Sequence, residues 1–335
     1  MTAPTAQIPE SHDYPFIRNV GSPLTADMLR PLDSRCHTVQ FKSALTESDY
    51  KTLAEWLSQY PSVTLRAYGS YDGSIKDLEF LRYFPTLTKF SADALRYKDF
   101  DSLSGLGYLP PTATMIGIGQ TKRRVSLAPL ARFTNLRRLF VEGQTKDIDV
   151  ISSLASLRSL TLRSITLPDL SILRPLHDLR ALALKLGGTR DLGLLPEIGC
   201  LEYLELWMVR GLDDISSIAF LDHLQYLFLQ SLKQVTTLPD FSRLTRLETV
   251  WMETMKGLTD LTPLLTAPSL RRVAAVDMGH LQPPAVGVLA DHPSLQQLRA
   301  GLGSKRKNEA VAQLVRLPAG EGWGKPRSLQ GEGDD

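Results

Sequence analysis

The sequence predicts an α/β solenoid, a single elongated horseshoe in which short parallel strands form a concave β-sheet and short 3₁₀ or coil segments form the convex side. Three observations predict this fold. Leucine accounts for 58 of the 335 residues, the motif L-x-x-L-x-L returns every 21 to 25 residues, and the segments between motifs place apolar residues at every third position. A period of this length is typical of stacked repeats, whereas two independent domains have no reason to produce it.

The repeat motif is clearest in the middle of the chain and weakens towards both ends. Its best copies begin at Leu136, Leu157, Leu179, Leu201 and Leu224, and copies with substitutions begin at Leu247, Leu270 and Leu295. Looser matches beginning at Ala113, Leu87 and Ser62 extend the array upstream to about eleven turns. Because each turn can bury its leucines only against its neighbours, the array predicts one continuous core.

Each repeat divides into a strand and a return segment. The final L-x-L of the motif alternates like a strand that is buried on one face. In the return segment, apolar residues follow one another at intervals of three, as in Val209, Leu212, Ile215 and Ile218. Since an α-helix repeats every 3.6 residues, and prolines such as Pro263 interrupt the segment, the pattern predicts 3₁₀ turns and coil on the convex side.

Both ends of the array predict caps. A strand is expected around Val39 and Phe41, followed by a helix whose start resembles a capping box at Thr46 to Asp49. A short helix is expected after the last repeat. We therefore expect a mobile N-terminal segment (1–35), an N-terminal strand-helix cap (36–61), the repeats (62–303), a C-terminal cap helix (304–318) and a disordered tail (319–335).

In its repeat period, strand motif and return segments, the chain resembles leucine-rich repeat proteins over about residues 62–303. The pieces DLSIL (169–173), DISSI (214–218) and DLTPL (260–264) look like the convex segments of internalin-type repeats. The resemblance implies a horseshoe, and it leaves function broad because such horseshoes serve many partners. The ninth repeat position is usually Asn or Cys in this family, but here it is Ile165, Gly187, Val209, Leu232, Met255 and Met278. We expect backbone groups or water to satisfy the buried amides there.

Composition narrows the classes of function. The formal charge of +2, from 38 basic and 36 acidic residues, provides no global field for nucleic acid or an anionic membrane. No apolar run approaches the roughly 18 residues of a membrane span, and residues 1–10 lack the features of a secretory signal, so we expect a cytoplasmic protein. Cys36 and Cys200 are expected to be reduced, with Cys200 as a small core residue. The six histidines show no H-E-x-x-H spacing, and we expect neither a metal nor a cofactor.

The repeat also predicts which residues line the concave sheet. In L-x-x-L-x-L-x the third, fifth and seventh positions point away from the core. On three adjacent turns these positions hold a patch of five rings with two acids beside it: Tyr203, Trp207, Tyr226, Phe228 and Trp251, with Glu205 and Glu253. Earlier turns present the basic residues Arg138, Arg163 and Lys185, so we expect a basic half and an aromatic half.

An exposed aromatic patch of this kind is typical of a binding site. Two alternatives remain open: the rings pack on one another to stiffen the sheet, or the register is shifted by one residue and they belong to the core. The arginines are equally compatible with an ordinary solvated surface.

The leading hypothesis is a non-catalytic scaffold, monomeric by itself, that binds an unidentified protein on its concave surface. The five rings would anchor the partner and the basic residues would orient it. An inhibitor or immunity-type protein that blocks an enzyme or toxin is the first alternative. A nucleic-acid binder using the arginines and rings is less expected, as is an enzyme with its site in residues 1–61, where the sequence shows no paired catalytic spacing.

Overall fold

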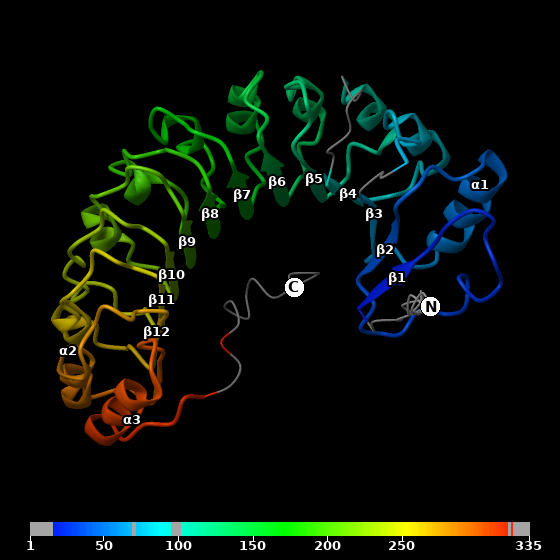
Figure 1. Cartoon of the computed structure of the whole chain (residues 1–335). Helices are drawn as coiled ribbons and strands as arrows, with labels where there is room; N and C mark the ends of the chain where they lie inside the picture. The colour runs from blue at the N-terminus through cyan, green and yellow to red at the C-terminus, as the bar shows by residue number, and fades with distance from the viewer. Residues whose placement is uncertain (1–15, 69–71, 95–101, 321–322, 324–335) are drawn as a thin grey trace, which may run out of the picture.

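The computed structural model describes residues 16–68, 72–94, 102–320 and 323. In this part of the chain thirteen parallel strands form one sheet, and their order in space is their order in the sequence. The sheet curves into a horseshoe, with strands along the concave side and short helical turns along the convex side (Figure 1). The structure therefore confirms the predicted solenoid, in which each turn packs against its sequence neighbours.

The strands have the following bounds: β1 (Ile17–Asn19), β2 (Thr38–Phe41), β3 (Thr64–Tyr68), β4 (Lys89–Ala94), β5 (Met115–Ile118), β6 (Arg138–Glu142), β7 (Ser159–Arg163), β8 (Ala181–Lys185), β9 (Tyr203–Trp207), β10 (Tyr226–Gln230), β11 (Thr249–Glu253), β12 (Arg272–Val276) and β13 (Gln297–Ala300). Three α-helices are described: α1 (Glu47–Leu57), α2 (Pro283–Gly287) and α3 (Lys305–Leu314).

The return segments contain 3₁₀ helices, as the period of three predicts. These are η1 (Glu79–Tyr83), η2 (Ser104–Tyr108), η3 (Ala128–Arg132), η4 (Ile148–Ser153), η5 (Ser171–Leu173), η6 (Leu195–Glu197), η7 (Ser216–Phe220), η8 (Thr262–Thr266) and η9 (Val288–Asp291). Two of the described return segments between repeat strands depart from this pattern. The segment between β10 and β11 contains turns but no 3₁₀ helix, and the segment between β12 and β13 contains α2 as well as η9. The sheet curves because neighbouring convex turns are spaced farther apart than the strands, which lie roughly 4.8 Å apart on the concave side.

Helices α1 and α3 lie where the sequence predicts helices at the two ends of the array. Thr46 caps α1, because its Oγ1 accepts a hydrogen bond from the backbone N–H of Asp49 at 3.2 Å. Strand β1 lies within the segment 1–35, which we expected to be mobile, and it pairs in parallel with β2. The expected disordered tail lies outside the described residues except for residues 319, 320 and 323.

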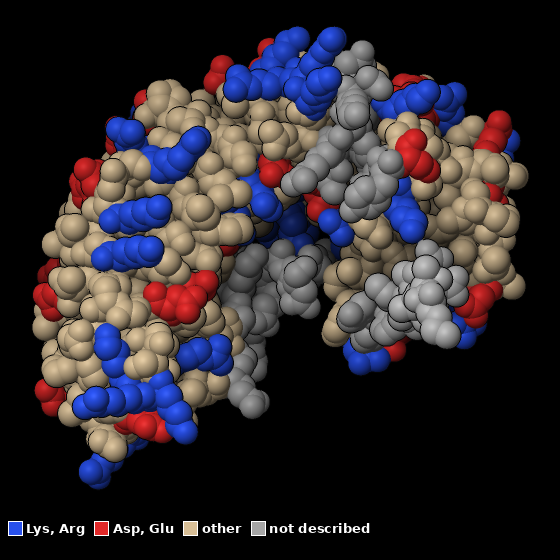
Figure 2. All heavy atoms as spheres, in the orientation of Figure 1, with Lys and Arg blue, Asp and Glu red and all other residues tan. Residues whose placement is uncertain are grey.

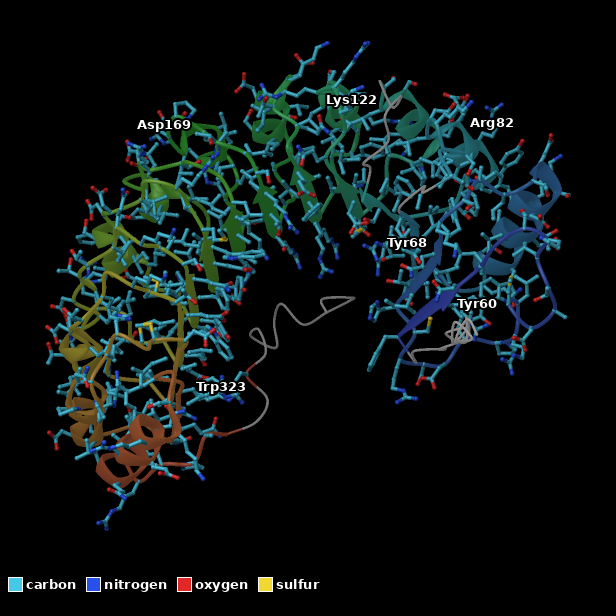
Figure 3. The ribbon with its side chains drawn as sticks, viewed as in Figure 1. Tyr60, Tyr68, Arg82, Lys122, Asp169 and Trp323 are labelled. Atoms are coloured by element: carbon cyan, nitrogen blue, oxygen red, sulfur yellow. The ribbon has the colours of Figure 1, made fainter. Side chains whose placement is uncertain are left out.

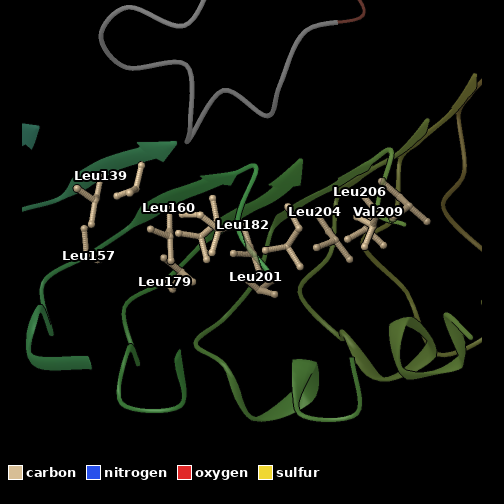
Figure 4. Close-up of a cluster of buried hydrophobic side chains, with 14 of the residues drawn as sticks. Leu139, Leu157, Leu160, Leu179, Leu182, Leu201, Leu204, Leu206 and Val209 are labelled. Atoms are coloured by element: carbon tan, nitrogen blue, oxygen red, sulfur yellow. The ribbon is translucent and has the colours of Figure 1, made fainter. Parts of the chain in front are cut away.

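The core is a continuous column of leucine side chains between the sheet and the convex turns (Figure 4). Strand pairing places Leu160, Leu182, Leu204 and Leu227 in one row, and at most 1% of each is exposed. Burying a leucine side chain contributes on the order of 1.5–3 kcal/mol, so a register shifted by one residue would expose the whole row at a large cost. The prediction for Cys200 is wrong, because this residue is exposed in the turn before Leu201.

Each repeat strand from β7 to β12 is followed directly by a residue with left-handed backbone, immediately before the ninth repeat position. These residues are Ser164, Leu186, Met208, Ser231, Thr254 and Asp277. Except at Asp277, their backbone N–H groups donate to the last carbonyl of the next strand, as from Leu186 to Trp207 at 2.8 Å and from Met208 to Gln230 at 2.8 Å. Backbone groups thus satisfy these eighth-position amides. At the ninth position, the backbone N–H of Met255 donates instead to the sulfur of Met278 at 3.2 Å.

Met208 provides a test of this turn, because a left-handed backbone costs an L-residue roughly 1–2 kcal/mol and glycine escapes that cost. Met208 has a φ of 50°, and its side chain is 43% exposed. We expect Met208→Gly to raise the free energy of unfolding in urea by about 0.5–1 kcal/mol, the gain being reduced by the entropy of glycine in the unfolded chain. Met208→Ala keeps a Cβ and serves as the control. A glycine variant no more stable than the alanine variant would contradict the expectation.

Candidate functional site

Parallel pairing arranges the inward positions of the repeats in three rows across the concave sheet. On β8 to β11 the first row is Ala181, Tyr203, Tyr226 and Thr249; the second is Ala183, Glu205, Phe228 and Trp251; the third is Lys185, Trp207, Gln230 and Glu253. Leu204 and Leu206, between these positions on β9, are fully buried. The map of inward and outward positions is therefore confirmed, and a shifted register is excluded.

Four of the five predicted rings pack together with Ala181, and Trp207 lies outside this cluster. The rings are also not equally accessible. Tyr203 packs on Tyr226 with ring centroids 5.4 Å apart, and Phe228 stacks on Trp251 at 6.1 Å. Tyr203 and Tyr226 are each only 5% exposed, so the expectation that all five rings are exposed is wrong for these two. They are covered because they lie against each other and against Ala181. Phe228, Trp251 and Trp207 stay partly exposed.

Trp207 lies close to two cations from the two preceding strands, β7 and β8. The Arg163 guanidinium carbon is 5.6 Å and the Lys185 Nζ 5.8 Å from its ring centroid. Lys185 also forms an ion pair with Glu205 at 2.9 Å, and Glu205 accepts a hydrogen bond from the Tyr203 hydroxyl at 2.9 Å. Cations and a carboxylate thus surround the indole and neutralise one another.

This pairing corrects the predicted division into a basic half and an aromatic half. Arg163 pairs with Glu142 at 3.2 Å, so the chain already provides a carboxylate for that charge as well. Figure 2 shows basic and acidic side chains interspersed over the visible face. The sequence map did not reveal the pairing, because it placed each residue on a face without its neighbour in the next turn.

Arg138 lies apart from the other predicted basic residues. It occupies the first position of β6 and pairs with Met115 and Ser159, whereas Arg163 and Lys185 close their strands. Four residues of strand separate the two rows, which corresponds to roughly 13 Å. Arg138 therefore belongs to the concave sheet but not to the group around Trp207.

Glu253, the second predicted acid, is held by its neighbours. It accepts hydrogen bonds from the Gln230 amide at 2.8 Å and from Trp251 Nε1 at 3.2 Å. These contacts fix the orientation of the Trp251 indole. Glu253 therefore contributes to the site by positioning the Trp251 ring.

Two residues of the site were missed from the sequence, Arg299 and Trp323. Arg299 lies on β13, and its guanidinium carbon is 5.6 Å from the Trp251 ring and 5.3 Å from the Trp323 ring. The two indoles meet edge to face at 5.8 Å. Figure 3 shows Trp323 on the inner side of the horseshoe. Arg299 occupies the fifth repeat position, like Phe228 and Trp251, so the map could have found it. Trp323 lies outside the period, and its only signal was a rare tryptophan in a glycine-rich segment.

Burial changes the acidity of the tyrosine beneath this group. Desolvation raises the pKa of the Tyr226 hydroxyl to about 12 from its ordinary value of 10.0. Because the pKa is higher in the folded state, the protonated form is favoured there, and stability present below pH 10 is lost as the pH rises towards 12. We expect the free energy of unfolding to fall less steeply over this range in Tyr226→Phe than in the wild type. Equal slopes in urea titrations at pH 9 to 11.5 would contradict the assignment.

Within the described part of the chain, the His, Cys, Asp and Glu side chains form no group of three or more that could bind a metal ion. None of the described helices is both long enough and apolar enough to cross a membrane. A depression of about 370 Å³ lies far from the concave rings, between α1 and η1, lined by residues such as Ala54, Tyr60 and Pro85. The ring cluster therefore remains the candidate site.

No protein-family model matches the chain, and no curated protein matches it in sequence. Among solved structures, an internalin (inlF) from Listeria monocytogenes is similar with a TM-score of 0.54 and 18% identity, over 83% of this chain and 76% of that one. An internalin C2 from the same species has a TM-score of 0.41 and 19% identity, over 66% and 82% of the two chains. A leucine-rich repeat protein from Leptospira interrogans has a TM-score of 0.40 and 13% identity, over 91% and 96%. The likeness to the first of these extends to the fold alone.

Proposed function

We propose that this chain, which has the leucine-rich repeat fold seen in internalins, is a non-catalytic scaffold that binds a protein partner on the concave surface of β9 to β11. The observation that carries the proposal is the presence of three partly exposed rings, Trp207, Phe228 and Trp251, on three adjacent parallel strands of the concave sheet. Tryptophan is enriched among the residues that contribute most to protein interfaces.

The order of these rings in the free protein supports the proposal. Phe228 and Trp251 stack with an angle of 15° between their planes, and Glu253 holds the Trp251 nitrogen. Trp207 is fixed by the cations on β7 and β8. Rings that are already ordered lose little conformational entropy on binding, which favours affinity.

The charges around the rings favour a partner with an apolar centre and a polar rim. Lys185 and Glu205 form an ion pair beside Trp207, with side chains 22% and 9% exposed. Partnered charges of this kind repel neither acidic nor basic groups strongly, but they require polar atoms opposite them. An interface of this composition is typical of specific protein complexes.

The test is quantitative binding of a partner captured with the full chain and identified by mass spectrometry. We expect Trp207→Ala or Trp251→Ala each to weaken binding by about 2 kcal/mol, or roughly 30-fold, if each ring is an anchor of the interface. Titration calorimetry with the purified partner measures the change. Circular dichroism checks that each variant remains folded.

Phe220→Ala is the matched control, because this ring is 51% exposed on η7, outside the concave sheet. Its removal should leave affinity unchanged. Wild-type affinity in both folded tryptophan variants would rule out the concave site, and loss of affinity in Phe220→Ala would move the interface to the convex side.

A further inference from the structure

The aromatic end of the concave surface already holds a side chain from elsewhere in the same chain. The Trp323 indole meets Trp251 edge to face, and the Arg299 guanidinium lies against both rings. On the opposite side the Tyr226 hydroxyl donates a hydrogen bond to the Trp323 carbonyl oxygen at 3.1 Å. We call these three residues, Tyr226, Trp251 and Arg299, the tryptophan seat.

The segment after α3 reaches the seat along the last strand of the sheet. The backbone N–H of Leu298 donates to the Pro318 carbonyl at 3.0 Å, so the segment pairs with the outer edge of β13. Gly320 follows with a φ of +65°, and a Cβ there would lie 2.3 Å from the Gln297 side chain. This left-handed backbone conformation is suited to glycine.

The Trp323 ring also contacts the backbone of Gly320. The Gly320 carbonyl accepts hydrogen bonds from Trp323 Nε1 at 3.2 Å and from Arg299 Nη2 at 3.2 Å. The seat therefore contacts a tryptophan ring, its backbone carbonyl and a carbonyl three residues before it. The Arg299 cation over the ring adds an electrostatic attraction to the ring face.

We propose that this seat is a binding site for a tryptophan side chain and its backbone carbonyl, that Trp323 occupies it in the free chain, and that the protein partner inserts a tryptophan of its own in place of Trp323. The last clause rests on the proposed function. The occupant is specified by the contacts: an indole for Trp251 and Arg299, and a backbone carbonyl for the Tyr226 hydroxyl.

The seat is tested without any partner. The probe is a synthetic peptide with the sequence of residues 319–327 (AGEGWGKPR), titrated by calorimetry into the full-length wild type and into full-length Trp323→Ala. Because a tethered tail competes at an effective concentration of roughly millimolar, we expect the variant to bind the peptide at least tenfold more tightly than the wild type. Equal binding to both proteins, including no binding to either, would overturn the seat.

Two controls establish that the ring and the seat are responsible. The same peptide with alanine at its tryptophan position should not bind Trp323→Ala, and the double variant Trp323→Ala/Arg299→Ala should bind the original peptide at least fivefold more weakly. Full affinity in either control would show that the peptide binds elsewhere.

The partner's use of the seat is tested separately. The partner should bind Trp323→Ala about tenfold more tightly than the wild type, because no internal ring has to leave. Unchanged or weaker binding would overturn the partner's use of the seat. Trp207 lies outside the seat. Unchanged partner affinity in Trp207→Ala would therefore count against the proposed function, but it would not affect the peptide result.

Discussion

Replacing Leu204 with alanine is expected to lower the free energy of unfolding by about 3 kcal/mol, within the range of roughly 2–5 kcal/mol for such changes in packed cores. Leu204 is fully buried on β9 and pairs in register with Leu182 and Leu227. Its removal leaves a cavity between three turns, and each turn depends on its neighbours for its core. Urea unfolding followed by far-ultraviolet circular dichroism measures the loss.

Two comparisons make this result specific. Leu204→Met keeps nearly the same volume and should cost less than about 1.5 kcal/mol. Leu314→Ala removes a leucine that is 50% exposed on α3, and it should change stability by no more than about 0.5 kcal/mol. If Leu204→Ala were as mild as Leu314→Ala, the column of leucines would not be the source of stability.

Replacing Gly187 with alanine is expected to cost roughly 2–3 kcal/mol, although the change adds a single methyl group. A Cβ at Gly187 would lie 2.0 Å from the carbonyl oxygen of Ile165 in the preceding turn. Because the obstacle is backbone, it cannot rotate away, and the two turns must separate. The Gly187 carbonyl also accepts the N–H of Arg210 at 2.8 Å, so the strain would reach the following turn as well.

The neighbouring Gly188 is the matched control. Its added Cβ would meet the Thr166 hydroxyl oxygen at 3.1 Å, an atom that a rotation of the side chain can move. Gly188→Ala should therefore cost less than about 1 kcal/mol in the same urea assay. Similar losses in the two variants would show that the close approach of backbone at Gly187 does not govern the spacing of these turns.

Most of the fold could be predicted because each repeat carries its own short sequence motif and the motif recurs many times. The residues around Leu204 and Leu227 assign their own strands, and the interval of three in the return segments predicts 3₁₀ helices, which the structure contains. Strand β1 could not be predicted in this way. It has three residues and no repeat motif, and it exists because β2 offers an edge for it to pair with.

The candidate site was predicted less completely. The sequence placed Trp207, Phe228 and Trp251 on the concave surface, and their pairing in rows confirms that placement. It also counted Tyr203 and Tyr226 as exposed, and these rings cover each other. The exposure of a side chain depends on the side chains that the neighbouring repeat places beside it. A map that treats each repeat separately does not contain this information.

The sequence by itself determined which side chains face the core and which face the concave surface, because alternation along a strand and the repeat period are properties of neighbouring residues. Only the tertiary structure decided that Lys185 is neutralised by Glu205 and that Trp323 lies on Trp251. The physical reason is the range of these contacts. The ion pair requires the register between two turns, and the ring contact requires the path of a segment that has no period at all.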